Sequence, residues 1–254
     1  TNITFSEGIG FLAESDPKTN VAFLVTAHES AHQWWGNMVT PGRAPGGNII
    51  SEGMAHYSTM MLIDQVLGER DRIEFAKRIE ERYGDGRQVD SERPMVKIDG
   101  SRPGDTTVTY DKGGWVMWML MNLVGREQTL AGLQEFVAAS IPGPDHPVLQ
   151  DLVEALRPHA EDPQAYQDFV DQWFFDVVVP EYELSDPEVV TDGDGWNVAF
   201  TVENSGTGRM TVEVAIERGV RFPDDDSEQA EPWREARTRV VLGGCETERV
   251  QVRV

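Results

Sequence analysis

Two histidines stand four residues apart in the segment His28-Glu29-Ser30-Ala31-His32, and a glutamate directly follows the first of them. On an α-helix, residues i and i+4 lie one above the other, so both imidazoles can reach one metal ion. Imidazole nitrogens bind zinc at about 2.0–2.1 Å, and a glutamate beside the metal can take a proton from an activated water. The spacing predicts a hydrolytic zinc site with His28 and His32 as ligands and Glu29 as general base. The alternative is a core helix whose histidines are merely hydrogen-bonded.

A zinc peptidase site needs a third protein ligand and an open fourth position. The next predicted helix opens with Ser51-Glu52-Gly53, after a loop over residues 41–47 whose Gly and Pro content lets the chain reverse. From spacing alone, Glu52 is either the third ligand or an ordinary first-turn glutamate that interacts favourably with the helix dipole.

Helical periodicity predicts the elements that must position these side chains. A helix is predicted over residues 20–38, and further helices over 51–67, 71–82, 111–124, 127–139, 147–157 and 163–176. The Gly, Pro and Asp content of residues 84–109 predicts irregular structure. The chemistry is therefore expected on a mostly helical part of the chain.

Near Pro180 the pattern changes to alternating apolar and polar residues, over 188–190, 196–203, 210–216, 238–242 and 248–254, separated by Gly-containing turns. This alternation is typical of a small antiparallel β-sandwich. We therefore predict two domains, 1–182 and 183–254. The acidic stretch 224–228 is predicted to be a solvated loop, with metal binding as the alternative.

The chain has 44 acidic and 22 basic residues, a formal net charge of −22, and 39% hydrophobic residues, enough for a packed core. Such an acidic surface repels phosphates and anionic lipid headgroups, so no nucleic-acid partner is expected. It either favours cationic substrates or serves solubility. With one cysteine, Cys245, no intrachain disulfide can form. No run approaches the ~18 apolar residues of a membrane span, and no signal peptide is visible.

Three segments together resemble the M1, or gluzincin, aminopeptidase family. Residues 28–37, His-Glu-Ser-Ala-His-Gln-Trp-Trp-Gly-Asn, resemble the family's zinc signature. Residues 51–57, Ser-Glu-Gly-Met-Ala-His-Tyr, resemble the segment that supplies the third ligand, here Glu52. Residues 110–114, Tyr-Asp-Lys-Gly-Gly, resemble a Tyr-Glu-Lys-Gly segment whose tyrosine, here Tyr110, donates a hydrogen bond to the tetrahedral intermediate.

The resemblance implies an α+β fold, in which a mostly helical thermolysin-like zinc peptidase catalytic domain is followed by a small β-sandwich. It also implies a small sheet near Ile3–Leu12, one zinc ion per chain, and a peptide substrate attacked near its N-terminus. His56, one turn after Glu52, is either a residue that supports a ligand or a surface histidine.

Two departures from the family pattern modify this expectation. Nineteen residues, 33–51, separate His32 from Glu52 where the family usually has eighteen, which resembles the M1-like domain linked to bacterial ABC-transporter permease proteins. That resemblance implies a soluble extracytoplasmic domain of a membrane-associated protein, whose transporter-like segments are absent from this chain. The chain begins at Thr1 in mid-pattern, so we expect a piece of a longer polypeptide.

The second departure is that residues 1–27 lack the Gly-x-Met-Glu-Asn motif that holds the substrate amine in family aminopeptidases. Glu7 is either a stand-in or a surface glutamate. The missing motif leaves an endopeptidase open and makes weak activity the expectation for this piece. A further alternative is a zinc-stabilised module that binds a peptide or partner without hydrolysis, although such a module would not need Glu29.

Overall fold

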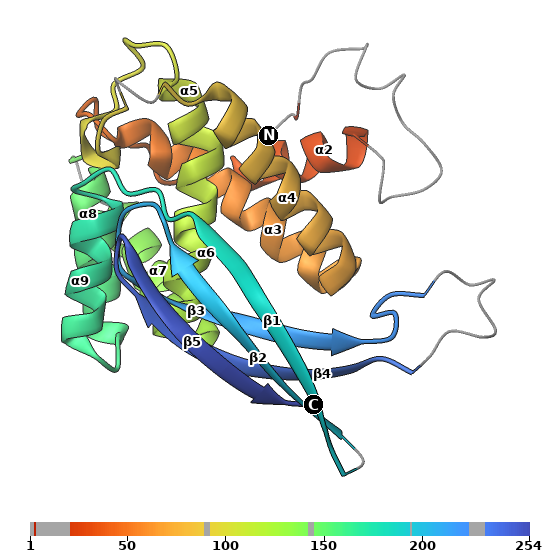
Figure 1. Ribbon diagram of the computed structural model, residues 1–254. Helices are drawn as coiled ribbons and strands as arrows, with labels where there is room; N and C mark the ends of the chain where they lie inside the picture. The colour runs from red at the N-terminus through yellow and green to blue at the C-terminus, as the bar shows by residue number, and fades with distance from the viewer. Residues whose placement is uncertain (1–2, 4–20, 89–91, 142–144, 194, 224–231) are drawn as a thin grey trace. The chain divides into compact units, whose positions relative to one another are not determined.

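The computed structural model describes residue 3 and residues 21–88, 92–141, 145–193, 195–223 and 232–254. The chain is a mixture of helix and sheet and divides into two compact units, Thr1–Val177 and Val178–Val254 (Figure 1). The first unit is helical in its described part, and the second consists of strands.

The helical unit contains the following elements in chain order: α2 (Val21–Ala31), the π-helix η1 (Ile49–Gly53), α3 (Met54–Val66), α4 (Glu69–Gly86), the 3-10 turn η2 (Met95–Lys97), α5 (Asp105–Thr107), the π-helix η3 (Val108–Lys112), α6 (Gly113–Val124), α7 (Arg126–Ser140), α8 (Leu149–Leu156), the 3-10 turn η4 (Arg157–His159) and α9 (Pro163–Trp173). The sequence-predicted helices downstream of residue 50 are confirmed, with ends that differ by a few residues.

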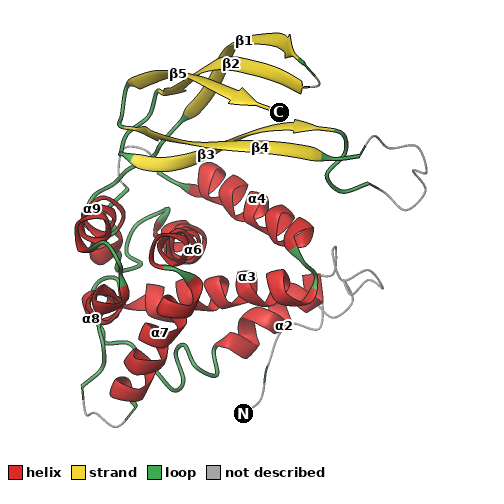
Figure 2. Cartoon of the chain, turned by 90° about the horizontal axis from the view of Figure 1, so that it is seen from below, coloured by secondary structure: helices red, strands yellow, loops and turns green. Residues whose placement is uncertain are grey.

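Helix α3 is the centre of this unit, because it packs against α2, α4 and α6 (Figure 2). Its buried apolar side chains, including Met60 and Ile63, are at most 1% exposed, as are Val116 and Leu120 of α6. Each such side chain stabilises the fold by roughly 1.5–3 kcal/mol relative to an exposed one. The helix that begins beside Glu52 is thus held on three sides.

The predicted helix over residues 20–38 is wrong at its C-terminal end, because α2 stops at Ala31. After Ala31, the backbone N–H groups of Gln33 and Trp34 donate to carbonyl oxygens three residues earlier instead of four. This 3-10 hydrogen-bond pattern ends the α-helix. Gly36 then adopts φ +103°, a left-handed conformation that strongly favours glycine and turns the chain away.

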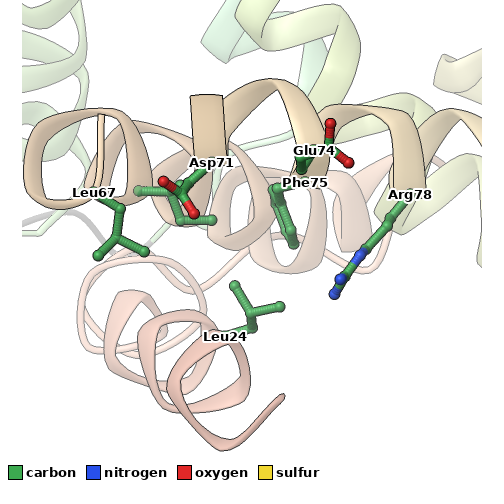
Figure 3. Close-up of a pocket in the computed structure, with 7 residues that line it drawn as sticks. Leu24, Leu67, Asp71, Glu74, Phe75 and Arg78 are labelled. Carbon is green, nitrogen blue, oxygen red and sulfur yellow. The ribbon is translucent and has the colours of Figure 1, made fainter. Parts of the chain in front are cut away.

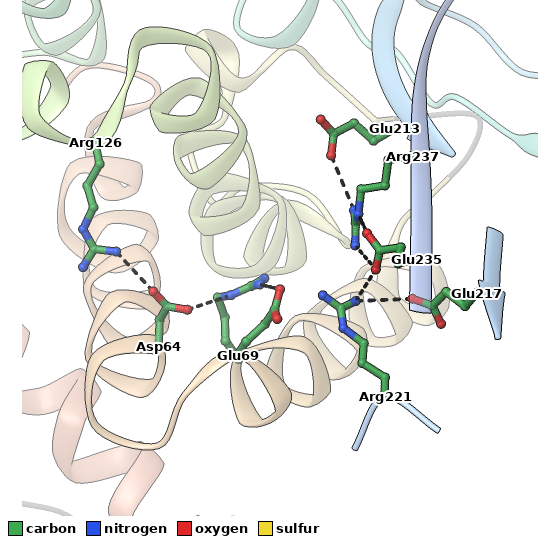
Figure 4. Close-up of polar contacts among 9 residues, drawn as sticks. Asp64, Glu69, Arg126, Glu213, Glu217, Arg221, Glu235 and Arg237 are labelled. Carbon is green, nitrogen blue, oxygen red and sulfur yellow. Dashed lines mark hydrogen bonds and ion pairs between the residues drawn. The ribbon is translucent and has the colours of Figure 1, made fainter. Parts of the chain in front are cut away.

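Charged contacts hold the C-terminal half of α3 to its neighbours (Figure 4). Asp64 lies 3.0 Å from Nε of Arg72 in α4 and 3.1 Å from Nη1 of Arg126 in α7. One carboxylate therefore joins α3 both to the next helix in the chain and to α7, whose Arg126 is 62 residues away in sequence.

The strand unit comprises β1 (Tyr182–Asp192), β2 (Gly195–Asn204), β3 (Met210–Arg218), β4 (Arg234–Leu242) and β5 (Glu246–Arg253). Antiparallel pairing gives a three-stranded sheet, β1-β2-β5, and a two-stranded sheet, β3-β4. Both sheets contribute to one apolar cluster, which includes Phe200, Val202, Val240 and Val250. All five predicted strands are confirmed. Apolar and polar residues alternate along β2, β3, β4 and β5 because every second side chain points into this cluster.

An ion-pair group lies across β3 and β4: Arg237 contacts Glu213 and Glu235, and Arg221 contacts Glu217 and Glu235 (Figure 4). Three sequence predictions lie outside the described residues. They are the acidic loop at 224–228, the role of Glu7, and the small sheet near Ile3–Leu12, of which only Ile3 is described. No helix in the described part of the chain is long and apolar enough to cross a bilayer.

Candidate metal centre

His28 and Glu29 lie in the last turn of α2, and His32 is the first residue after it. The two imidazole rings stand edge to face, with centroids 4.8 Å apart. Nε2 of His28 is 3.1 Å, and Nε2 of His32 is 3.2 Å, from the same oxygen, Oε2 of Glu52. Three possible metal-binding atoms, two imidazole nitrogens and one carboxylate oxygen, therefore lie close together, although Glu52 is 24 residues from His28 in sequence.

The donor set fits zinc. Two imidazoles and a carboxylate form the His₂Glu set of catalytic zinc sites, and ligands at about 2.0–2.1 Å in a tetrahedron stand about 3.3 Å apart. The distances of 3.1 and 3.2 Å from Glu52 to the two imidazole nitrogens match such an edge. Glu29 is adjacent, because donor atoms of His28, Glu29 and His32 all lie within 4.8 Å of one another.

Glu52 projects from the π-helix η1, and Tyr110 projects from the second π-helix, η3. Single π-helical turns inside longer helices occur often at functional sites because they redirect a side chain. The two segments pack together at glycines: a β-carbon on Gly53 would lie 3.0 Å from the carbonyl oxygen of Thr109, and one on Gly113 would lie 3.3 Å from Cα of Gly53. This close approach brings Tyr110 to Glu52.

His32 is oriented by the turn that ends α2. Its Nδ1 lies 2.9 Å from the carbonyl oxygen of Trp35, which can only accept, so Nδ1 carries the proton and Nε2 presents a lone pair. A metal-binding histidine requires this tautomer, and a backbone carbonyl is one of its usual partners. The buried Trp35 indole, which donates to Ser58, anchors that carbonyl.

Tyr110 lies against the histidines. Its ring stacks on that of His28 with centroids 5.9 Å apart and planes at 17°, and its hydroxyl lies beside the carboxylate of Glu52. Burial, followed by the charge of Glu52, raises the pKa of the Tyr110 phenol to about 12. The hydroxyl therefore keeps its proton at neutral pH and can donate it in a hydrogen bond.

The carboxylate of Glu52 is ionised at neutral pH. Burial alone would raise its pKa, but the hydrogen bond with His28, the charge of His32 and the Tyr110 hydroxyl outweigh burial and leave the pKa below its usual value. A carboxylate in this state is an anionic oxygen ligand for a cation.

His56 is buried, with 8% of its surface exposed, so the surface-histidine alternative is wrong. Its Nδ1 lies 2.9 Å from Nδ1 of His28. Burial, with the nearby His28 and Arg82, lowers the pKa of His56 to about 3, so this imidazole is neutral. Sequence reasoning left its role open, because nothing in the spacing shows that α3 turns this residue towards His28.

A small pocket lies elsewhere, between α2, α3 and α4 (Figure 3). Its lining residues are Leu24, Ile63, Leu67, Asp71, Glu74, Phe75 and Arg78. No member of the histidine and glutamate cluster contributes to it, although the Phe75 ring also contacts His56 at 6.2 Å between centroids. The candidate centre is therefore defined by its converging donors and not by this pocket.

A His-Glu-x-x-His helix whose histidines meet a downstream glutamate is the arrangement of a metallopeptidase. Residues 9–173 match the model of the Peptidase family M1 domain. The chain belongs to peptidase family M1, as the sequence motifs predicted.

Two curated relatives are aminopeptidases by name. The chain is 32% identical over 111 residues to leucine aminopeptidase 2 of Chaetomium globosum, and 28% identical over 139 residues to human endoplasmic reticulum aminopeptidase 2. These matches cover 41% and 48% of this chain, but only 18% and 14% of those proteins.

Among solved structures, the chain is similar to a mutant M1 zinc metallopeptidase from Deinococcus radiodurans bound to a Tyr-Ser-Ala substrate. The TM-score is 0.49 at 21% identity, and the match covers 62% of this chain and 34% of that one.

Proposed function

We propose that the chain is the catalytic part of a zinc-dependent metallopeptidase of aminopeptidase type, with one zinc ion held by His28, His32 and Glu52. The observation that carries this proposal is the convergence of both histidine Nε2 atoms on one oxygen of Glu52, at 3.1 and 3.2 Å. Membership of family M1 supports it. We assign the helical catalytic domain, of thermolysin type, to residues 1–182 and a β-sandwich domain to residues 183–254.

Bound zinc would supply a Lewis acid that polarises the scissile carbonyl and increases the acidity of the attacking water. Glu29 takes the proton of that water and returns it to the leaving amine, so one carboxylate serves first as base and then as acid. Its place next to both histidines supports this role.

Tyr110 donates its hydroxyl proton in a hydrogen bond to the oxyanion of the tetrahedral intermediate. The stacking of its ring on His28 supports this role, and its raised pKa keeps the donor proton in place. A preorganised donor of this kind is typically worth about 10²–10³ in rate.

The substrate class is a peptide, as the family implies. The names of the two relatives favour cleavage of the N-terminal residue. The proposal also includes the cellular setting. Nineteen residues separate His32 from Glu52, a spacing that resembles that of extracytoplasmic M1-like domains linked to transporter permeases.

Hydrolysis by metal-free and zinc-loaded protein tests the proposal, on a panel of unblocked and N-acetylated peptides. We expect about one equivalent of zinc, activity that follows the zinc content, and cleavage of unblocked peptides alone. A His32→Ala variant should lose both zinc and activity. Preferred cleavage of the acetylated peptides would indicate an endopeptidase. Zinc binding without even weak hydrolysis of any peptide would overturn the catalytic assignment in favour of a binding module.

A further inference from the structure

The ring of His28 has two nitrogens, and the candidate metal site uses only one of them. Nε2 faces Glu52 at 3.1 Å, while Nδ1 faces Nδ1 of His56 at 2.9 Å. A neutral imidazole carries a single proton, so a ligand that offers the Nε2 lone pair to a metal has its proton on Nδ1. That proton needs an acceptor, and His56 Nδ1 lies at hydrogen-bond distance from it.

His56 is fixed from several directions. It belongs to α3, which directly continues the π-helix η1 that carries Glu52, so His56 lies about one helical turn after that ligand. Its ring contacts that of Tyr110 edge to face, with centroids 5.5 Å apart. A β-carbon on Gly114 of α6 would lie only 2.7 Å from the β-carbon of His56. Only a glycine at 114 lets α6 approach the histidine so closely.

The far side of the His56 ring faces a buried acid. Nε2 of His56 lies 3.8 Å from Oδ1 of Asp111, whose side chain is 2% exposed. Neither atom has a hydrogen-bond partner among the described residues, and Arg82 approaches the same oxygen at 3.3 Å. With Nδ1 as acceptor, the His56 ring has its own proton on Nε2, the nitrogen that lies 3.8 Å from Asp111.

We infer that His56 is a positioning residue of the metal centre, which accepts the Nδ1 proton of His28 and has the buried Asp111 carboxyl group 3.8 Å from its other ring nitrogen. The inference rests on the proposed zinc site. It extends the usual carboxylate–histidine–metal arrangement by one imidazole. The arrangement fixes the tautomer and the ring orientation of His28, and both determine where its Nε2 lone pair points.

A positioning role and a packing role predict opposite orders for two variants. In His56→Asn, the amide oxygen takes the place of Nδ1 and can accept from His28, although volume is lost. In His56→Leu, the volume is conserved but the acceptor disappears. If His56 positions His28, Asn retains zinc better than Leu; if it only fills space, Leu retains zinc better than Asn.

The measurement is the zinc dissociation constant, obtained by competition with a chromogenic chelator. We expect His56→Leu to weaken zinc binding by about 10–100-fold, the usual cost of losing a partner of a metal ligand. His56→Asn should retain most of the affinity. Thr59→Val, which removes another buried polar group of α3 without contact to His28, should bind zinc as the unaltered chain does. Absorption of the cobalt-substituted protein gives a second readout, since a reoriented His28 changes the visible bands.

Asp111→Asn should weaken zinc binding when residue 56 is histidine. The same substitution should have no effect in the His56→Asn background, because an asparagine at position 56 has no group at the position of Nε2 to interact with residue 111. If His56→Leu does not fold in circular dichroism, His56→Gln replaces it, since its amide lies at the Nε2 position and leaves His28 without an acceptor.

Equal affinity of the Leu variant and the unaltered chain, or a larger loss in Asn than in Leu or Gln, would overturn the inference while leaving the zinc site intact. Failure of the unaltered chain to bind zinc would instead overturn the proposed function itself.

Discussion

The ammonium nitrogen of Lys112 lies 2.6 Å from Oε1 of Glu92, and the two side chains are only 5% and 1% exposed. Arg87 and the Tyr83 hydroxyl complete the environment of this carboxylate, each with a contact of 2.9 Å. Lys112 follows Tyr110 by two residues in the π-helix η3. The buried pair therefore ties the segment that carries Tyr110 to the chain around Glu92.

Lys112→Met should destabilise the chain by about 3–5 kcal/mol, because it leaves a buried carboxylate without its closest cation. Urea unfolding measures the change. Lys77→Met is the matched control, since the Lys77–Glu74 pair is about 60% exposed on both sides and should contribute less than about 1 kcal/mol. Equal effects of the two substitutions would contradict the importance assigned to the buried pair.

Glu92→Gln should remove part of the acid sensitivity of the fold. Burial alone would raise the pKa of Glu92, but Lys112, Arg87 and Tyr83 outweigh it and hold the pKa below its usual value. A carboxyl with a lowered pKa in the folded state stabilises the fold above its ordinary pKa of about 4.3 and loses that contribution as pH falls.

The stability difference between the unaltered chain and Glu92→Gln should therefore shrink between about pH 5 and about pH 3. Urea unfolding over this range measures the difference. A difference that stays constant with pH would show that the carboxyl is not shifted in the folded chain.

Gly114→Ala should cost about 1–3 kcal/mol of stability, since the added methyl would lie 2.7 Å from the β-carbon of His56. It should also weaken zinc binding, because the displaced His56 contacts His28. Gly84→Ala in α4 is the control: nothing lies within 4 Å of its added β-carbon, so it should be neutral or stabilising by about 0.5–1 kcal/mol. Thermal unfolding and chelator competition test both variants, and unchanged zinc affinity in Gly114→Ala would contradict this account of the close contact.

Tyr110→Phe should keep zinc but lower kcat by about 10²–10³, because only the hydroxyl that faces the oxyanion is lost. Steady-state hydrolysis of an unblocked peptide gives the comparison. A rise in KM with kcat unchanged would show that the hydroxyl binds the substrate and not the transition state.

The sequence was sufficient for the features that depend on local periodicity. The i, i+4 spacing of His28 and His32 predicted a helix with both imidazoles on one face, and alternation predicted the five strands. The early end of α2 was not predictable in this way, because it depends on hydrogen bonds three residues back and on the positive φ of Gly36.

Long-range contacts explain what the sequence left open. The burial of His56 depends on how closely α3 and α6 approach at Gly114, which no local pattern encodes. The π-helical turns that carry Glu52 and Tyr110 resemble ordinary helix in the sequence, because packing of η1 against η3 sets their register. The pairing of Lys112 with Glu92, twenty residues apart, is likewise a tertiary contact.

Glu29 is the proposed proton carrier of a zinc-dependent peptidase, and the substitution Glu29→Gln is the decisive test of this role. The amide conserves the size and shape of the side chain but cannot take a proton from water. The measurement is kcat on an unblocked peptide for the zinc-loaded unaltered chain and for the variant, with the zinc content of both preparations determined. We expect the same zinc content in both proteins and a loss of at least about 10²-fold in kcat in the variant. Equal turnover by the two proteins would contradict this role and place the base elsewhere.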